Sequence, residues 1–553
     1  MGSIFFEVTI ILCTAAFLAI FFRFLRQPAI IAYLLTGILI GPFGQLQIQN
    51  HEVLTAMGDF GIALLLFILG LEFKFKELRS VGKSALFVGP LQVVLTGVAS
   101  YFLTIFLGYG SNIATYVAIA FAFSSTIIIV TLLTDKRETN SLHGKMTIGI
   151  LLVQDLVAVL VLMIMSGFGS STNFLAVFPM VIIKSILLFA AIAVLSVSVL
   201  PYIVHRLART LDILFLFSLA WVFMITALTS SSLIGFPIAV GGFLAGISLA
   251  NATESLQIAA RVRTLRDFFI TIFFVSLGMQ MDFSSLWAIL FPAIILSLFV
   301  FIGKPLIVLG IMEFFGYHKR TAFLTAITMG QISEFSLVIV FLGKSFGHIP
   351  NEAVTMITVV SVITFILSTY AIGYSKRMYM VIGGYMSLFG SKAGAVKETE
   401  RVKDHVVLVG AHRIGESILT ALQQGKENVI VVDFNPDIIE HLKKKGVVHV
   451  FGDVSDAEIQ ERLQLQHAKI IISTVPDIDD NLLLLEGYKR MSGNALFIAI
   501  AKSREEAKIL YKAGADYVVL PDLIGGIHIA GLLKDNVKEK IEKLREKDAT
   551  LLL

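Results

Sequence analysis

Hydrophobic residues run along the first two thirds of the chain in long stretches that only short polar segments interrupt. A helix needs roughly 20 mostly apolar residues to cross about 30 Å of hydrocarbon. Thirteen stretches in residues 1–377 have about this length, although some are shorter and one is longer. They lie near 4–22, 29–44, 53–71, 84–107, 112–133, 146–167, 174–200, 211–229, 232–250, 267–281, 285–315, 320–343 and 352–374. The pattern therefore predicts a polytopic α-helical membrane protein with thirteen spans.

After residue 377 the pattern changes to short apolar runs that alternate with amphipathic segments. Five runs are typical of strands: His405–Gly410, Asn428–Asp433, Val447–Phe451, Lys469–Thr474 and Ala495–Ala501. Strands separated by helices of about ten residues favour a parallel, doubly wound α/β sheet of the Rossmann type. The predicted organisation is a transmembrane domain at 1–377, a linker at 378–402, a Rossmann-like domain at 403–530 and a charged helix at 531–553.

Composition supports this division. The chain is 56% hydrophobic and only 15% charged, with a mean hydropathy of +0.85, which excludes a single soluble globule. Cys13 is the one cysteine, so no intrachain disulfide can form. No basic tract indicates a nucleic-acid partner. The first apolar run contains Glu7 and lacks basic residues before it, so it is interpreted as a retained span rather than a cleaved signal.

The basic residues of the membrane domain gather in alternate loops. They are Arg23, Arg26, Lys74, Lys76, Arg79, Lys83, Lys136, Arg137, Lys145, Arg206, Arg209, Arg261, Arg263, Arg266, Lys319, Arg320, Lys376 and Arg377. The other set of loops carries Lys344 alone. Because cytoplasmic loops are enriched in Lys and Arg, we expect the N-terminus outside and the C-terminal domain in the cytoplasm.

Few ionisable residues lie at membrane depth. A charge at the centre of a spanning helix costs roughly 2.5–3.5 kcal/mol on insertion scales, so it needs a partner, a cavity or a function. Lys184 is explained by snorkelling towards the interface. Asp155 follows Gln154 in an otherwise apolar helix and has no basic neighbour one turn away. This polar pair predicts a transport site.

Two other spans contain runs of small and polar residues. The span at 112–133 contains Ser124, Ser125 and Thr126. The span at 320–343 contains a run from Thr328 to Glu334 that includes Gln331. Such residues also serve as ordinary helix-packing surfaces. They equally allow a helix to unwind where its carbonyls line a cavity. The two spans are seven apart and run in opposite directions, as expected for an inverted repeat whose interrupted helices cross at the midplane.

Together, these motifs resemble the monovalent cation:proton antiporter-2 family, and its Kef-type, glutathione-regulated potassium-efflux branch in particular. The strings that carry the resemblance are Phe123–Thr126, Val153–Asp155, Gly278-Met279 with Asp282, and Gly330–Phe335. The resemblance implies a homodimer in a bacterial-type inner membrane that exchanges potassium for protons. A sodium:proton antiporter of the same fold stays open, because hard oxygen ligands alone do not separate the two cations.

The resemblance also assigns roles to single residues. Asp155 is expected to hold the cation and the proton in turn, and Lys304 to be its ion-pair partner. Electrogenic relatives have a second aspartate at the position of Gln154, so one titrating carboxylate and electroneutral exchange are expected. The expected ion-binding residues are Asp155, Gln154, Thr126, Ser125, Ser124, Lys304, Glu334 and Gln331. No resident metal is expected beyond the transported alkali cation.

The first turn of the α/β domain has the spacing of a dinucleotide fingerprint. Gly410 and Gly415 bracket it after a strand, and Asp433 ends the next strand, where it could bind a ribose. His412 replaces the central glycine, which normally lets the backbone approach a pyrophosphate. AMP has no pyrophosphate and is therefore a better fit than NAD(H). Alternatively, the domain retains the fold without a working nucleotide site. The domain resembles regulators of potassium conductance (RCK N), which adds Asp453 and Thr474. The expected nucleotide-binding residues are Gly410, His412, Arg413, Ile414, Gly415, Asp433, Asp453 and Thr474.

Rival functions explain less of the sequence. A ligand-gated potassium channel needs a selectivity filter after a short pore helix. The sequence Leu107–Gly110 resembles part of such a filter, but it follows a full-length span instead of a short pore helix. A membrane-bound NAD oxidoreductase would need a catalytic acid–base pair, and none accompanies the nucleotide fold, so no enzyme is expected. By resemblance, glutathione and an ancillary subunit are candidate partners besides potassium, protons and an adenine nucleotide.

Overall fold

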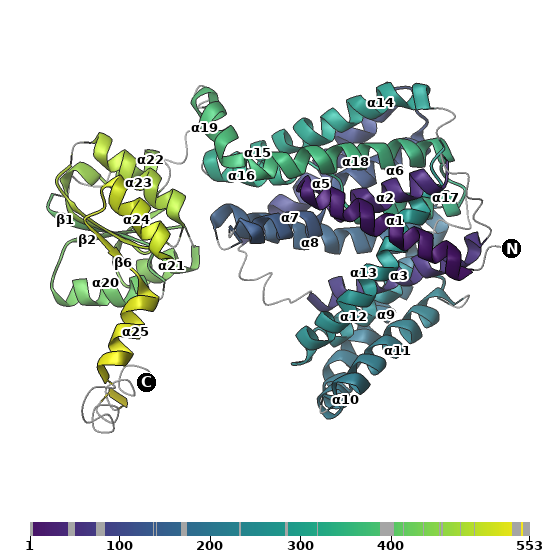
Figure 1. Cartoon of the computed structure of the whole chain (residues 1–553), viewed down its shortest axis with the longest axis horizontal. Helices are drawn as coiled ribbons and strands as arrows, with labels where there is room; N and C mark the ends of the chain where they lie inside the picture. The colour runs from purple at the N-terminus through teal and green to yellow at the C-terminus, as the bar shows by residue number, and fades with distance from the viewer. Residues whose placement is uncertain are drawn as a thin grey trace. The chain divides into compact units, whose positions relative to one another are not determined.

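The computed structural model describes residues 4–42, 50–72, 83–166, 174–282, 286–386, 403–532 and 544–545, apart from positions 137, 140, 209, 232, 233, 318, 413, 435, 453, 455, 456, 476 and 492. The chain divides into two compact units, Met1–Gly390 and Ser391–Leu553, each of which is described by itself. The first unit is helical, and the second is a sheet flanked by helices (Figure 1).

The first half of the helical unit comprises α1 (Ile4–Phe24), α2 (Ala29–Ile40), α3 (His51–Glu72), α5 (Lys83–Phe106), α6 (Ser111–Ala122), α7 (Thr126–Asp135) and α8 (Leu142–Ser166). The second half comprises α9 (Phe174–Ser198), α10 (Leu200–Leu207), α11 (Leu211–Ser230), α12 (Ile238–Leu249), α13 (Ser255–Met279), α14 (Leu286–Leu298), a π-helical turn (Phe299–Gly303), α15 (Lys304–Phe314), α16 (Lys319–Thr328), α17 (Glu334–Ser345) and α18 (Asn351–Gly373). A further helix, α19 (Ser375–Met386), follows directly.

Many of these helices are long and apolar enough to cross a membrane. Among the described residues there are eight such helices, or nine if the bent pair α9 and α10 forms one span. The predicted number of thirteen is not confirmed. The difference arises because α2 and α12 are short, α16 and α17 are separate segments, and the first half of α13 carries Arg261, Arg263 and Arg266.

Small residues bring α2, α3, α12 and α13 into close contact. A Cβ atom on Gly37 would lie 2.1 Å from the Val275 carbonyl oxygen, and one on Gly246 would lie 2.1 Å from that of Phe67. Larger side chains at either glycine would force the backbones apart. Close backbone approach through small residues is the usual way in which membrane helices pack. These four helices therefore form one tightly packed layer, which we call the scaffold.

Two helices are interrupted, as the sequence predicted. Between α6 and α7 the chain is not helical at residues 123–125, and between α16 and α17 it is not helical at residues 329–333. The Ser125 hydroxyl accepts a hydrogen bond from the Ile128 amide (3.2 Å), and the Ser333 hydroxyl accepts one from the Phe335 amide (3.2 Å). Each serine therefore caps the restarted helix and satisfies main-chain donors that the interruption exposes.

The second unit contains a six-stranded parallel sheet in the order β3-β2-β1-β4-β5-β6. The strands are β1 (His405–Val409), β2 (Val429–Asp433), β3 (Val448–Phe451), β4 (Ala468–Ser473), β5 (Leu496–Ile500) and β6 (Tyr517–Val519). The helices are α20 (Ile414–Gln424), α21 (Pro436–Lys444), α22 (Ala457–Arg462), α23 (Ile478–Arg490), α24 (Arg504–Ala513) and α25 (Pro521–Leu532). The predicted Rossmann-type sheet is confirmed.

The first five strands match the predicted ones within two residues at each end, whereas β6 was not predicted because this strand has only three residues. β1 lies at the centre of the sheet, between β2 and β4, so the chain reverses its direction of winding there. In open α/β sheets, ligands bind outside the carboxyl ends of the strands at this point. Nearly all of the predicted charged helix at 531–553 and of the linker after Met386 lies outside the described residues.

Candidate functional site

Asp155 lies on α8 opposite the interruption between α6 and α7. The Thr126 hydroxyl, at the first residue of α7, donates a hydrogen bond to Asp155 Oδ2 (2.9 Å). The Asp155 side chain is buried, with 2% of its residue surface exposed. A carboxylate in apolar surroundings is unstable unless a proton or a cation neutralises it. The geometry thus provides an oxygen site that either of these can occupy.

Gln154 holds the interrupted helix in place. Its Oε1 atom accepts a hydrogen bond from the Ser124 amide (3.0 Å), and its Nε2 group donates to Gln92 Oε1 on α5. Gln92 in turn donates to the Ala122 carbonyl (3.1 Å), at the end of α6. Gln154 therefore links α5, α8 and the interruption, and both of its polar atoms are used in doing so.

Sequence reasoning did not identify Gln92. The available signal was a single amide side chain in the apolar run of residues 84–107, where an unpaired polar group is costly. Gln92 is completely buried and also donates to Thr96 Oγ1 (2.9 Å). Its two hydrogen-bonding atoms complete the polar cluster around the interruption, so it belongs to the site as a positioning residue.

Glu334 brings a second carboxylate to the same region. It is the first residue of α17 and accepts a hydrogen bond from Ser125 Oγ across the two interruptions. The positive end of the α17 dipole stabilises negative charge at this position. Ser124 Oγ donates to the Met329 carbonyl (3.3 Å). The serines of one interruption thus contact the other, and the predicted juxtaposition of Ser124, Ser125 and Glu334 is present in the structure.

Lys304 lies between the two interruptions and contacts both. Its ammonium group donates to the Phe123 carbonyl (2.7 Å) and to the Gln331 carbonyl (3.0 Å), and the residue is completely buried. This corrects the expected ion pair, because Lys304 and Asp155 form none in the structure. The physical reason is that carbonyls at an interrupted helix lack intrahelical donors, and the negative end of α6 attracts a cation.

The backbone before Lys304 adapts to this position. A π-helical turn, Phe299–Gly303, leads into Lys304, and Pro305 follows it. Proline cannot donate a main-chain hydrogen bond, so the wider turn accommodates the missing bond. Gln331 is fixed separately, because Ser368 Oγ donates to its Oε1 atom (2.7 Å). Its Nε2 atom is buried without a hydrogen-bond acceptor in the structure, and among the described residues the side chain forms no hydrogen bond with Asp155 or Thr126.

A buried ionic cluster lies in the loop between α7 and α8. Glu138 accepts from Lys136 (3.3 Å), Lys376 (3.1 Å) and His143 (3.2 Å), and its side chain is only 4% exposed. Burial alone would raise the pKa of Glu138, but the His143 hydrogen bond and the charges of Lys376 and Lys136 outweigh it and hold the pKa at about 2. Lys136 also donates to the Ile372 carbonyl (2.9 Å).

This cluster connects α7, which begins at the ion site, with the junction of α18 and α19. Sequence reasoning counted Lys136 and Lys376 only as loop charges and did not identify Glu138. No sequence pattern identifies Glu138, because one of its partners, Lys376, lies more than 200 residues further along the chain.

The predicted nucleotide turn is formed at the carboxyl end of β1. Gly410 has a φ of +83°, and a Cβ atom on Gly415 would lie 2.0 Å from the Gly410 carbonyl oxygen. Both glycines are therefore needed for the tight turn into α20. Thr474 Oγ1 donates to the Gly410 carbonyl (3.0 Å) from the end of β4. His412 is exposed on the turn.

Asp433 takes part in the turn itself. Its Oδ2 atom accepts a hydrogen bond from the Ala411 amide (2.8 Å), so the carboxylate ties the end of β2 to the loop. The arrangement of turn, helix N-terminus and acidic residue fits a nucleotide, with the phosphate at the start of α20. Ile414 begins α20 and is half exposed. Arg413 and Asp453 lie outside the described residues.

Comparisons with known proteins agree with both units. Residues 10–373 match the family model "Sodium/hydrogen exchanger, transmembrane", and residues 406–521 match the TrkA-N domain model. A putative K(+) efflux antiporter, KefB, of Alkalimonas amylolytica is 26% identical over 519 residues, which cover 92% of this chain and 78% of that protein. The putative cation/proton antiporter YbaL of Escherichia coli is 25% identical over 516 residues, covering 90% of this chain and 91% of that protein.

One solved structure is similar over the helical unit. The sodium proton antiporter MjNhaP1 from Methanocaldococcus jannaschii has a TM-score of 0.51 and 16% identity, and the match covers 68% of this chain and 97% of that chain. This similarity concerns the fold alone. Together with the family matches, it confirms the resemblance drawn from the sequence motifs and the class of membrane fold.

Proposed function

We propose that this chain, a member of the sodium/hydrogen exchanger family and thus a membrane-spanning cation/proton antiporter, exchanges potassium for protons at Asp155. The observation that carries the proposal is the buried Asp155 carboxylate held by the Thr126 hydroxyl at the start of an interrupted helix. Both groups are oxygen ligands of the kind that a hard cation prefers.

Exchange follows from the cost of a bare charge in the membrane. A buried carboxylate is stable when it is protonated or when it binds a cation, and it is expensive when it is neither. If the site changes its exposure only in a neutralised form, each crossing carries one proton or one cation. Alternation of the two gives antiport, and Gln154 in place of a second acid makes the exchange electroneutral.

Lys304 supports this cycle as a positioning residue and does not bind the cation itself. Its ammonium group satisfies the carbonyls of Phe123 and Gln331, one from each interruption. It therefore bonds to both unwound segments and holds them together. Ser125 and Glu334 add a second link between the same segments. We assign these three residues positioning roles and reserve direct cation contact for Asp155 and Thr126.

Potassium is proposed as the exported cation because relatives that align with most of this chain are named for potassium efflux. The oxygen ligands at Asp155 and Thr126 do not by themselves distinguish potassium from sodium. Reconstituted protein tests both proposals together. A potassium gradient is expected to drive proton movement across proteoliposomes, and an equal sodium gradient is expected to drive less. If a sodium gradient drives proton movement faster than an equal potassium gradient, the protein is a sodium:proton antiporter and the potassium proposal is wrong.

We further propose that the C-terminal domain, residues 403–530, regulates the exchanger by binding an adenine nucleotide, AMP rather than NAD(H). The turn from Gly410 to Gly415, with Asp433 beside it, supports this reading. A ligand shifts an equilibrium only by its differential affinity for two states. Binding must therefore be compared with its effect on transport. AMP that binds but leaves the exchange rate unchanged would remove the regulatory part of the proposal.

A further inference from the structure

Two connections join α7 to α8, one at each end of α7. At the first end, the Thr126 hydroxyl donates to Asp155 Oδ2 (2.9 Å). At the other end, the Glu138 amide donates to the Leu133 carbonyl in the last turn of α7 (2.8 Å). The Glu138 carboxylate accepts from His143 in the first turn of α8 (3.2 Å). Glu138 is thus fixed to both helices, about 15 Å along α7 from the ion site.

The loop that carries Glu138 is packed tightly against α8. A Cβ atom on Gly144 would lie 2.0 Å from the Glu138 carbonyl oxygen, so the α8 backbone lies directly against the loop backbone. The Ser141 hydroxyl donates to the same carbonyl (2.6 Å) and accepts from the Gly144 amide (3.1 Å). The main chain therefore fixes Glu138 on one side, and its ionic partners fix it on the other.

Two lysines attach α18 and α19 to this loop. Lys376, in the first turn of α19, contacts Glu138 Oε1 (3.1 Å). Lys136 follows the last residue of α7 and contacts Glu138 Oε2 (3.3 Å). It also donates to the Ile372 carbonyl of α18 (2.9 Å) and to the Ser375 hydroxyl of α19 (3.1 Å). Removing one partner of a buried ion pair is strongly destabilising, so a displacement of α19 pulls on the end of α7.

Apolar packing couples the two ends of α7. Ile129, in the middle of α7, is buried in one core with Ile150 of α8 and Ile372 of α18. Close-packed interiors have low compressibility and transmit strain. A displacement at the Glu138 end is therefore passed along α7 to Thr126, which carries the hydroxyl of the ion site.

We propose that Glu138 and Lys376 are positioning residues of the ion site: they hold α7 so that the Thr126 hydroxyl stays within reach of Asp155, and they pass displacements of α19 to that hydroxyl. This inference rests on the proposed function, in which Thr126 is a cation ligand. α19 is the last described helix of the first unit, so a change in the following unit reaches the membrane helices along the chain through α19.

Potassium-driven proton movement by the full chain, measured well below its melting temperature, tests the proposal. Lys376→Met is expected to raise the KM for potassium about fourfold and to leave kcat within about twofold, because one cation ligand is displaced and the carboxylate stays. Lys376→Arg keeps the charge and is expected to restore the wild-type KM. An unchanged KM in Lys376→Met, or a lower kcat alone, would overturn the proposal.

A double-mutant cycle shows whether the effect passes through Thr126. In a Thr126→Val protein no hydroxyl is left to position, so adding Lys376→Met is expected to change the KM less than about 1.5-fold. Independent damage to the fold would instead raise the KM about fourfold in both backgrounds, because the effects of independent sites are additive in free energy. A fourfold rise in the Thr126→Val background would therefore contradict the positioning role.

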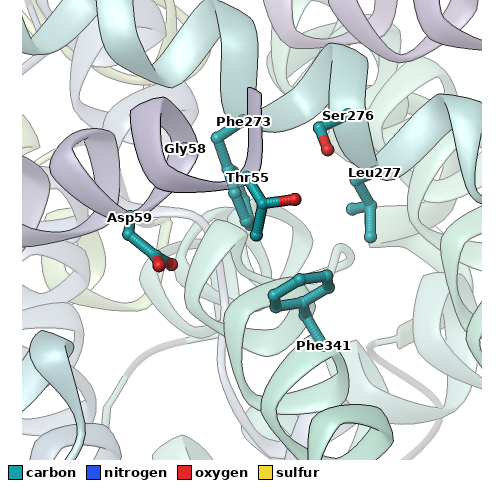
Figure 2. Close-up of a pocket in the computed structure, with 7 residues that line it drawn as sticks. All are labelled: Thr55, Gly58, Asp59, Phe273, Ser276, Leu277 and Phe341. Carbon is teal, nitrogen blue, oxygen red and sulfur yellow. The ribbon is translucent and has the colours of Figure 1, made fainter. Parts of the chain in front are cut away.

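Two variants of matching charge serve as controls. Arg377 is the next residue of α19, but it is exposed, and its guanidinium lies over the Tyr374 ring (5.9 Å to the centroid). Asp59 is a half-buried carboxylate at a separate pocket, whose described residues belong to α3, α13 and α17 (Figure 2). Glu138→Gln is expected to raise the KM as Lys376→Met does, whereas Arg377→Met and Asp59→Asn are expected to keep it. A comparable rise in either control would show a general effect of charge and contradict the proposal.

Hydrogen exchange of the α7 amides separates this proposal from the function on which it rests. These amides are expected to exchange at least tenfold faster in Lys376→Met than in the wild-type protein, because local opening becomes easier. In Arg377→Met they are expected to exchange at the wild-type rate. Wild-type exchange in Lys376→Met would refute the positioning role and leave the antiport proposal intact. Faster exchange in Lys376→Met, with no potassium-driven proton movement by the wild-type protein, would support the link to α7 and refute the antiport function.

Discussion

Thr126 and Asp155 are joined by a hydrogen bond of 2.9 Å from the threonine hydroxyl to the aspartate Oδ2 atom. The threonine is the first residue of α7, and the aspartate lies in the middle of α8. A movement of α7 therefore changes the surroundings of the carboxylate directly. The same α7 ends near the Glu138 cluster, which holds the junction of α18 and α19.

Replacing Thr126 by valine tests this bond. Hydrogen bonds to charged groups contribute roughly 1.5–3 kcal/mol, and the hydroxyl is also a cation ligand in the proposed cycle. Thr126→Val is expected to raise the KM for potassium at least tenfold, and Thr126→Ser to restore most of the affinity. Thr134, exposed on the same helix, is the control: Thr134→Val is expected to leave transport unchanged. Wild-type KM in Thr126→Val would contradict the assignment.

The partners of Lys304 make a prediction about stability. Lys304→Met leaves two buried carbonyls without donors, at about 1–3 kcal/mol each, so the melting temperature is expected to fall clearly. Lys184 is the control, because it is only partly buried and donates to the Ile234 carbonyl near a helix end (3.1 Å). Lys184→Met is expected to cost much less, and an equal loss in the two variants would contradict the structural role of Lys304.

A double-mutant cycle separates this role from an ion pair with Asp155. If Lys304 bonds only to carbonyls, Lys304→Met and Asp155→Asn are expected to be nearly additive, with a coupling of about 0.5 kcal/mol or less. Breaking a buried ion pair by removing one partner costs about 3–5 kcal/mol, and neutralising Asp155 would then relieve that cost. A strong coupling energy would contradict this role and would support the ion pair between Lys304 and Asp155 that the sequence suggested.

Glu138 predicts a dependence of stability on acid. Its pKa is about 2 in the folded protein against an ordinary value of 4.5. A lowered pKa contributes stability above the ordinary value, and this contribution is lost as the pH falls from about 4.5 towards 2. The shift corresponds to roughly 3 kcal/mol at 1.36 kcal/mol per pKa unit. Glu138→Gln is expected to lower the melting temperature at pH 7 and to flatten its dependence between pH 5 and 3.

Asp135, exposed at the end of α7, is the matched control for this measurement. Asp135→Asn removes a carboxylate from the same turn and is expected to keep the wild-type acid dependence. If Glu138→Gln retains that dependence as well, the buried cluster does not supply the stability assigned to it.

Asp433 links nucleotide binding to the loop that it anchors. Asp433→Ala removes the acceptor of the Ala411 amide and the expected ribose ligand, so AMP affinity by calorimetry is expected to fall at least tenfold. Asp477 caps α23 in the same domain (2.9 Å to the Asp479 amide), and Asp477→Ala is expected to lower domain stability without changing AMP affinity. AMP binding of wild-type strength in Asp433→Ala would contradict the site.

Much of this arrangement could be predicted from short-range patterns. An acid beside an amide in an apolar run marked Gln154 and Asp155, and runs of small and polar residues marked both interruptions. Alternating short apolar runs marked five strands, because buried parallel strands are apolar on both faces. Each of these signals lies within a few neighbouring residues.

The features that escaped prediction depend on contacts between distant segments. The partners of Lys304 are carbonyls from two interruptions, and main-chain groups carry no sequence signal. Gln92 and Glu138 find their partners only in the folded protein, where α5 packs beside α8 and α19 lies beside the loop after α7. The number of spans is not confirmed for a related reason. Hydropathy does not show where a long apolar run is divided, or that a helix such as α13 begins well before its apolar part.

The most direct test of the central claim is potassium-driven proton movement in proteoliposomes that contain Asp155→Asn. Asparagine keeps an oxygen acceptor for Thr126 but cannot exchange a proton for a cation. The variant is expected to fold with a melting temperature near that of the wild-type protein and to show no potassium-driven proton movement. Proton movement at the wild-type rate in a well-folded Asp155→Asn protein would contradict the account.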